Sequence, residues 1–183
     1  MLNMLVLRDW QSFYLLTGTA AATLIGLLFI AISIGSNLPM QQITNNLQTF
    51  VNPTLLYYFQ VLLISCLSVM PLQSPFIYIA AFAILGILNI VLTSKVSWRI
   101  LVIHSEDEIV FRHWVWHFLL PFIAGLLLLA SAIGFLLGVQ LAPLGLAIAD
   151  LLCLTIGLHN TWILTLWLAV RRNQDRQSEE KMR

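Results

Sequence analysis

The sequence predicts an all-α protein: a polytopic transmembrane helical bundle of five spans, with the N-terminus outside and the C-terminus in the cytoplasm. Its residues are 60% hydrophobic and only 9% charged, whereas a soluble domain carries about 25% charged residues. The apolar residues are gathered into long uncharged stretches, and a bilayer-crossing helix needs about 20 such residues. Almost all Lys and Arg residues then fall on one side of the predicted membrane, as the positive-inside rule requires.

Five stretches are apolar enough to be spans. Lipid offers no hydrogen-bond partner to an open backbone amide, so we expect each span to be a closed helix. Residues 1–170 are expected to form a single transmembrane domain, and residues 171–183 a charged cytoplasmic tail that frays into water. The predicted spans cover, in chain order, residues 13–34, 53–70, 75–92, 114–137 and 144–170.

The connections between these spans differ in character. The first, residues 36–52, carries no charge and repeats apolar residues at helical spacing. It is expected to be either a short helix lying at the membrane interface or an ordered polar loop. Spans two and three are separated only by PLQS, which begins with Pro71 and is followed by Pro75. Because proline breaks helices, this segment predicts a tight hairpin between the two spans. The sequence GVQLAP predicts another tight hairpin between the last two spans.

The distribution of basic residues sets the predicted orientation. Of the nine Lys and Arg residues, only Arg8 precedes the first span. The others lie in the loop at 93–113 or in the tail, and five spans place these two segments on the same side. Because basic residues are retained in the cytoplasm, that side is predicted to be cytoplasmic.

Small residues at four-residue spacing predict close helix packing, because backbones in lipid approach one another only where side chains are small. The last span carries the longest such row, and the first and fourth spans carry shorter ones. The predicted packing residues are Gly18, Ala22, Gly26, Gly134, Gly138, Gly145, Ala149, Cys153 and Gly157. Such rows suit packing within one chain and also packing between copies, so a homo-oligomer is expected as well.

Asp150 is the one charged residue inside a predicted span. A carboxylate at mid-membrane costs about 2.5–3.5 kcal/mol on insertion scales, so such a residue faces the bundle interior or a wet cavity. Since no span contains Lys or Arg, its partner is expected to be a hydroxyl, an amide, water or a cation. Two roles stay open: ion or proton handling, and a structural carboxyl. His159 lies on nearly the opposite helix face and is interpreted as structural, whereas Asn160 is expected to hydrogen-bond between helices.

Two classes of function are compatible with these residues. The candidate polar or ion path is lined by Asp150, Asn160, His159, Gln60, Thr19 and Thr23. Copies assembled around this path would form an ion- or small-solute-conducting channel or transport unit. The alternative is a non-conducting accessory protein that binds or modulates another membrane protein, such as a membrane protease. A weaker alternative is a haem-binding redox protein using His117 and His159.

Other classes are disfavoured by the residues present. No Ser-His-Asp set, glycine-rich phosphate loop or pair of catalytic carboxylates can be assembled, so we expect no enzyme and no catalytic residue. His113 and His117 are weak metal candidates on one helix face, and neither a metal nor a cofactor is predicted. Cys66 and Cys153 are interpreted as buried small residues. A net charge of +1 argues against a nucleic-acid partner.

Two segments carry further patterns: DWQSFYLLTGTAAATLIGLLFIAISI at 9–34 and GLHNTWILTLW at 157–167. They resemble the first and last spans of a family of small, uncharacterised bacterial multi-pass membrane proteins. The family's last span carries an Asn-Ala-Trp motif followed by an acidic residue; here Thr161 replaces the Ala and Ile163 replaces the acid. The resemblance implies a multi-pass protein of the bacterial plasma (inner) membrane. Relatives are sometimes labelled modulators of the FtsH membrane protease, which implies a protein partner and supplies no catalytic residue.

Overall fold

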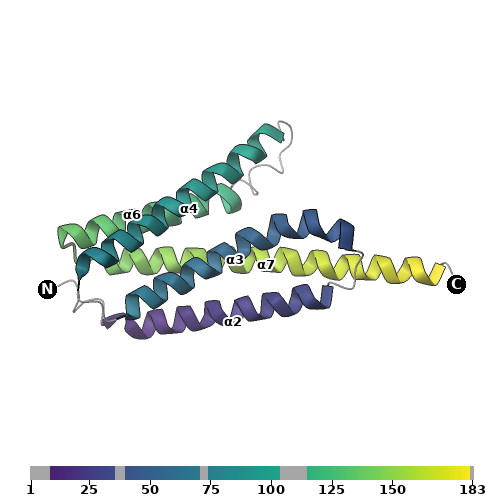
Figure 1. Ribbon diagram of the computed structural model, residues 1–183, viewed down its shortest axis with the longest axis horizontal. Coiled ribbons are helices and arrows are strands. Elements are labelled where there is room, and N and C mark those ends of the chain that lie inside the picture. The colour runs from purple at the N-terminus through teal and green to yellow at the C-terminus, as the bar shows by residue number, and fades with distance from the viewer. Residues whose placement is uncertain (1–8, 36–39, 71–73, 104–114, 182–183) are drawn as a thin grey trace.

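The computed structural model describes residues 9–35, 40–70, 74–103 and 115–181, and within them every regular element is a helix (Figure 1). The long helices are α2 (Gln11–Gly35), α3 (Met40–Val69), α4 (Pro75–Ile103), α6 (Leu120–Leu137) and α7 (Ala142–Lys181). A short π-helical turn, η1 (Val115–Leu119), leads into α6. The predicted all-α class is confirmed for this part of the chain.

Four helices contain a segment long and apolar enough to cross a membrane. These segments are Gln11–Ser33 in α2, Phe76–Ser94 in α4, Leu120–Leu137 in α6 and Ala142–Leu166 in α7. The remaining predicted span corresponds to the shorter apolar part of α3, Thr54–Val69. At 1.5 Å per residue this part is about 24 Å long, less than the ~30 Å of a hydrocarbon core. The whole of α3 is longer because it begins at Met40.

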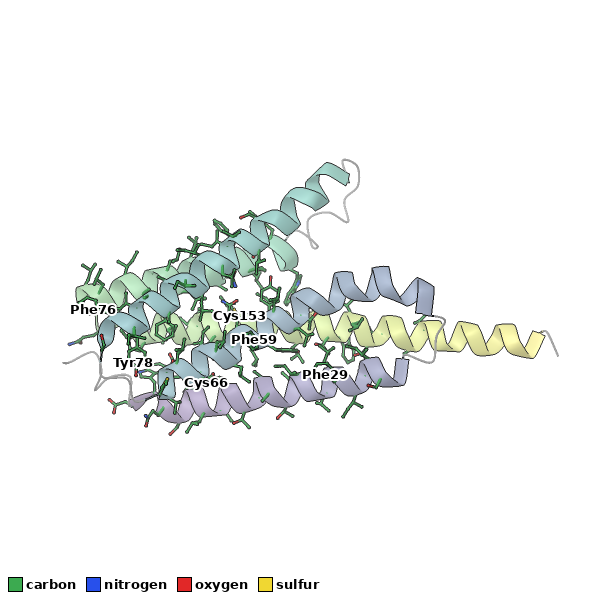
Figure 2. The ribbon with its side chains drawn as sticks, viewed as in Figure 1. Phe29, Phe59, Cys66, Phe76, Tyr78 and Cys153 are labelled. Atoms are coloured by element: carbon green, nitrogen blue, oxygen red, sulfur yellow. The ribbon has the colours of Figure 1, made fainter. Side chains whose placement is uncertain are left out.

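The outer surface of the bundle is apolar, whereas part of its interior is polar. Large apolar side chains such as Phe29, Phe59 and Phe76 are more than half exposed on their helices (Figure 2). The buried polar residues are Thr17, Thr54, Ser65, Ser68, Asn89, Thr93, Ser131, Asp150 and Asn160. A soluble protein places its polar groups mainly in water. The distribution, together with the four apolar helices, is typical of a multi-pass membrane protein.

Helix α7 lies at the centre of the bundle, with two helix pairs beside it (Figure 1). In one pair α2 packs on α3, and in the other α4 packs on α6. Both α3 and α6 also pack on α7. The residues of α7 can therefore meet side chains from both pairs, which makes this helix the natural position for a site.

The connection predicted as a tight hairpin is short, since α3 ends at Val69 and α4 begins at Pro75, and its residues 71–73 lie outside the described ranges. The two helices nevertheless make few contacts with each other. The position of α4 is set instead by two glycines. A Cβ at Gly86 would lie 3.2 Å from the carbonyl oxygen of Gly125, and a Cβ at Gly125 would lie 3.4 Å from that of Gly86. Backbones approach this closely only where side chains are missing. Helix α4 therefore lies against α6.

The connection between α6 and α7 is the tight hairpin that the sequence predicts. Helix α6 ends at Leu137, and Gly138 follows with a left-handed φ of 75°. The N–H of Val139 donates a hydrogen bond to the carbonyl oxygen of Gly134 at 2.8 Å. Glycine adopts this backbone conformation without a steric penalty, so the chain reverses and α7 begins at Ala142.

Three helices extend beyond their apolar segments, which corrects several predicted boundaries. Helix α4 reaches Ile103 instead of ending near residue 92, and α7 reaches Lys181, so the tail predicted to fray is helical. The connection predicted at 36–52 is, from Met40 onward, the first part of α3. Residues 87–103 and 158–181 contain no Gly or Pro. Because a helix satisfies its own backbone hydrogen bonds in water as well as in lipid, the end of an apolar stretch does not end the helix.

Candidate functional site

Asp150 of α7 is completely buried, at 0% exposure, and neither carboxylate oxygen has a hydrogen bond of normal geometry among the described residues, although the Thr17 hydroxyl lies close enough to interact with the carboxyl group. Its polar neighbours on α2 are Thr17 and Tyr14. The Thr17 hydroxyl donates to the Tyr14 carbonyl oxygen at 3.3 Å and lies 3.1 Å from the Ser65 hydroxyl of α3. The carboxyl group therefore lies beside a small cluster of hydroxyls whose hydrogen bonds are made to one another and to the backbone.

This hydroxyl cluster, formed by Tyr14, Thr17 and Ser65, joins three helices. The buried Tyr14 donates its hydroxyl hydrogen to the carbonyl oxygen of Pro143, at the start of α7, over 3.3 Å. Gly18 allows α3 to approach α2, because a Cβ there would lie only 2.8 Å from the Cβ of Ser65. The sequence indicated Gly18 as a packing residue but gave no sign of the hydroxyl cluster that this packing creates.

The described side chains around Asp150 include no Lys or Arg to balance its charge. Residues 10–94 and 113–170 contain no Lys or Arg, and Asp150 is their only acidic residue. An ionised carboxylate in an apolar interior without a counter-charge is much less stable than a neutral or paired group. The position therefore requires that a proton or a bound cation neutralise the carboxylate.

A second polar contact joins α3 to α4. The Nδ2 of Asn89, which is 3% exposed, donates to the Oε1 of Gln60 at 2.9 Å. The Nε2 of Gln60 and the Oδ1 of Asn89 are buried and have no partner in the described part of the chain. Gln60 is one of the predicted path residues, but Asn89 was missed. The only available signal was a single amide within the apolar run ILNIVL.

A third polar contact joins α3 to α7. The hydroxyl oxygens of Tyr58 and Thr161 are 2.9 Å apart. Thr161 donates its own hydrogen to the carbonyl oxygen of Gly157 at 2.9 Å, so Tyr58 is the donor in the contact between the two side chains. Asn160, beside Thr161, is 7% exposed. This contact lies about three helical turns along α7 from Asp150.

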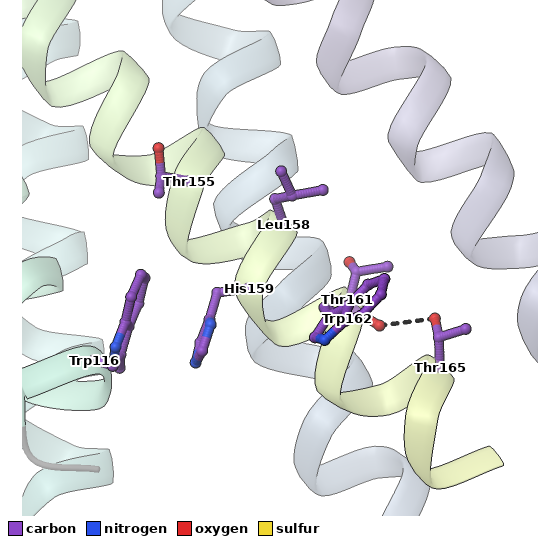
Figure 3. A pocket seen from close by; sticks show the side chains of 7 residues that line it. All are labelled: Trp116, Thr155, Leu158, His159, Thr161, Trp162 and Thr165. Carbon is purple, nitrogen blue, oxygen red and sulfur yellow. Dashed lines mark hydrogen bonds between the residues drawn. The ribbon is translucent and has the colours of Figure 1, made fainter. Parts of the chain in front are cut away.

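His159 lies in a groove on α7 and stacks on a ring from η1. The His159 and Trp116 rings have a centroid distance of 3.9 Å and an interplanar angle of 15° (Figure 3). The groove has a volume of about 440 Å³ and is also lined by Thr155, Leu158, Thr161, Trp162 and Thr165. Since Trp162 is 65% exposed, the groove faces the outside of the bundle.

The six residues predicted to line one path do not form a single group. Asp150 lies beside α2, Gln60 contacts α4, and His159 lies in the outer groove; Asn160 is buried on α7, ten residues after Asp150. Thr19 and Thr23 are exposed on α2, and their hydroxyls donate to the backbone carbonyls four residues earlier, at 2.7 and 2.9 Å. A threonine that is bonded to its own helix needs no polar neighbour, which explains why these two residues face outward.

The predicted packing residues also occupy different surroundings. Ala149 and Cys153 are completely buried. A Cβ would lie within 3.0 Å of a neighbouring atom at Gly18, Gly134, Gly145 and Gly157. Gly138 forms the turn after α6. Ala22 and Gly26 lie on the exposed side of α2, and a Cβ at Gly26 would meet nothing within 4 Å. The buried side of α2 is formed by Tyr14, Thr17, Ala21 and Leu28.

The predicted metal candidates are not placed by the structure. His113 lies outside the described residues, and only the backbone of His117 is described. Elsewhere in the described ranges no three His, Cys, Asp or Glu side chains are grouped closely enough to hold a metal ion. Both cysteines are free; Cys153 is buried, but Cys66 is exposed on α3, which corrects its predicted burial. A small apolar thiol can face lipid without cost.

No protein-family model, no curated protein and no solved structure matches this chain. The resemblance of the two end spans to a bacterial membrane-protein family therefore stays a prediction.

Proposed function

We propose that the protein is a multi-pass membrane transport protein for protons or small monovalent cations, and that Asp150 is the group that binds them. One observation carries this proposal: a completely buried carboxyl group, with both oxygens unpartnered among the described residues, inside a bundle with an apolar outer surface. Buried charges in proteins are normally paired or bind ions. Ionisable residues within membrane spans commonly mark ion pathways.

The charge balance at Asp150 favours a monovalent ion. A proton or a monovalent cation neutralises one carboxylate, whereas a divalent cation would leave a net positive charge in an apolar interior. The nearby Thr17 and Ser65 hydroxyls offer oxygen atoms, which suit protons and hard cations better than soft transition metals.

The proposal includes five membrane crossings in a bacterial plasma membrane, with the N-terminus outside. Four crossings use the long apolar segments, and α3, a helix of 30 residues, supplies the fifth. Arg171 and Arg172 directly follow the apolar part of α7, which favours a cytoplasmic position for that end. Asp150 then lies in the outer half of the membrane.

The ion-binding group lies within one chain, so transport does not require an axial pore between copies. Thr19 and Thr23, which would line such a pore, are exposed and bonded to their own helix. The proposal also includes self-association, through the outer surface of α2. The exposed Ala22 and Gly26 give α2 a smooth outer surface, on which a second copy can pack closely.

The test is ion flux into liposomes that contain the purified protein, with wild type compared with Asp150→Asn. Asn has nearly the same shape as Asp but cannot take up a proton or balance a cation. Thr23→Val is the matched control, because Thr23 lies in an exposed position and bonds only its own helix among the described contacts. We expect Asp150→Asn to lower H⁺, Na⁺ or K⁺ flux roughly tenfold and the control to match wild type.

Two results would contradict this proposal. If wild-type liposomes carry no more H⁺, Na⁺ or K⁺ than empty liposomes, the protein is not such a transporter. If Asp150→Asn conducts as well as wild type, the carboxyl group is structural. Circular dichroism and detergent melting curves for all three proteins would separate lost transport from lost folding.

A second candidate is the accessory role, which one observation favours. Helix α7 continues from the end of its apolar segment at Leu166 to Lys181 and projects beyond the other helices (Figure 1). The projecting part, RRNQDRQSEEK, carries both signs of charge and would suit a protein partner at the membrane surface. An accessory protein would give no flux in liposomes and would retain a membrane partner through purification, and removal of residues 173–183 would release that partner.

A further inference from the structure

The hydroxyl cluster beside Asp150 uses all three of its hydrogens within itself and on the backbone. Tyr14 donates to the carbonyl oxygen of Pro143, and Thr17 donates to the carbonyl oxygen of Tyr14, each over 3.3 Å. The hydroxyl oxygens of Thr17 and Ser65 are 3.1 Å apart. Because a hydroxyl has one hydrogen and that of Thr17 is already used, Ser65 is the donor in this contact. The cluster therefore has no hydrogen left for the carboxyl group.

An acceptor, in contrast, is still available beside the carboxyl group. A hydroxyl oxygen has two lone pairs, and Ser65 occupies only one of those on Thr17. Thr17 also lies close enough to Asp150 to interact with it. An ionised carboxylate needs hydrogen-bond donors, whereas a protonated carboxyl group needs an acceptor for its O–H. The hydrogen bonds of the cluster therefore match the protonated form of Asp150.

The packing around the cluster also favours a proton over a metal cation. A hard cation needs several oxygen ligands arranged around it, whereas a proton requires no additional space. The two helices α2 and α3 are in close contact here, since a Cβ at Gly18 would lie 2.8 Å from the Cβ of Ser65. Leu146 and Ala149, which neighbour Asp150 on α7, are completely buried.

The neighbouring titratable groups leave the charge of Asp150 unbalanced. Tyr14 on α2 and Cys153 on α7 lie near enough to interact electrostatically with Asp150, and both side chains are ordinarily neutral at pH 7. Ser65 of α3 does not titrate, and α6 contains no titratable residue. Even if Thr17 turned its hydrogen toward a carboxylate, a single neutral donor would not replace a counter-charge in an apolar interior.

We propose that the ion bound at Asp150 is a proton, and that Thr17 positions it by accepting a hydrogen bond from the protonated carboxyl group. The inference rests on the proposed function, of which it names the ion. The role of Thr17 is to set how tightly the proton is held, while the proton itself resides on the carboxyl group.

The test is infrared spectroscopy of the purified protein in liposomes, which follows the C=O stretching band of a protonated carboxyl group. Asp150→Asn identifies the band, because the band should disappear in this variant. Thr17→Val removes the acceptor with little change of shape, and Thr17→Ser retains the hydroxyl. Thr23→Val is the matched control, since Thr23 is exposed on the same helix and bonds its own backbone.

We expect wild type to show the band near neutral pH, both with and without Na⁺ or K⁺. In Thr17→Val the band should move to higher frequency, because its hydrogen bond is lost, and the proton should be bound roughly tenfold more weakly in a pH titration. Thr17→Ser and Thr23→Val should both match wild type. A merely structural role of Thr17 would change the melting temperature but not the frequency of the band.

Three results would overturn the proposal. They are absence of the band in wild type, loss of the band when Na⁺ or K⁺ is added, and tighter proton binding in Thr17→Val, which would make Thr17 a donor to a carboxylate. Liposome flux separates this inference from the proposed function. The band without H⁺ flux would retain the bound proton and reject transport, whereas flux that depends on Asp150 but occurs without the band would retain transport and reject the proton held by Thr17.

Discussion

At the scale of single residues, Gly157 shows how one missing side chain sets the distance between two helices. A Cβ at this position would lie 2.6 Å from a ring carbon of Tyr58. The Tyr58 ring is also held by its hydrogen bond to Thr161, so it cannot move aside freely. The sequence predicted Gly157 as a packing residue, but not its aromatic partner, which lies far away in the chain on α3.

We expect Gly157→Val to destabilise the bundle by about 1–3 kcal/mol, the usual cost of overpacking a core. Gly26→Val is the matched control, because a Cβ at Gly26 meets nothing within 4 Å. Thermal unfolding in detergent, followed by circular dichroism, measures both variants. Equal melting temperatures for the two would show that α3 and α7 do not pack as described.

The cost of placing polar groups in lipid explains which site residues could be predicted from the sequence. Asp150 and Asn160 are buried, as this cost requires. The same reasoning assigned Thr19 and Thr23 to the path. A threonine hydroxyl can hydrogen-bond its own helix, however, so the presence of a threonine does not indicate whether its side chain faces the bundle interior or the outside. Asn89 was missed because a single amide among apolar residues forms no motif.

At the scale of helices, hydropathy predicts where a span lies but not where its helix ends. Neither α4 nor α7 meets a Gly or Pro after its apolar segment, so each continues into polar sequence. Conversely, Pro53 lies inside α3 without ending it. Helix pairing was also beyond the sequence. Gly86 is the only glycine of its span, and Gly125 is nine residues from Gly134, the other glycine of its span, so their close approach is evident only in three dimensions.

We expect the projecting end of α7 to be dispensable for folding. A chain that stops after Arg172 should melt within about 4 °C of the full-length protein, a difference of ~1 kcal/mol at this length. The reason is that residues 173–181 extend past the other helices (Figure 1). A fall in melting temperature well beyond this range would mean that the projecting end packs on the bundle.

At the scale of the whole molecule, apolar side chains form most of the buried core and also cover the outer surface. Aromatic and aliphatic residues cover the outside, while hydroxyls, amides and one carboxyl lie between the helices. The apolar stretches could be predicted because four of them are uncharged over their full length and the last holds a single charged residue, Asp150. Their arrangement around α7 could not, because it depends on which small residues meet.

The proposed membrane topology predicts that the two ends of the chain lie on opposite sides of the membrane. In a Cys66→Ser background, a cysteine at Asn3 should react with an impermeant thiol reagent in intact cells. A cysteine at Ser178 should react only after the membrane is permeabilised. If both sites react in intact cells, or neither does, the number of crossings is even, and the position assigned to Asp150 in the outer half of the membrane must be abandoned.

Helix α7 is uninterrupted from Ala142 to Lys181, a rod about 60 Å long. Asp150 lies near one end of this rod, and the other end projects from the bundle. Because a helix resists stretching along its axis, a protein that pulls or turns the projecting end transmits mechanical force to the acid. In the proposed transporter, the depth of Asp150, and with it the strength of ion binding, would then be adjusted from the opposite face of the membrane without any hinge in between.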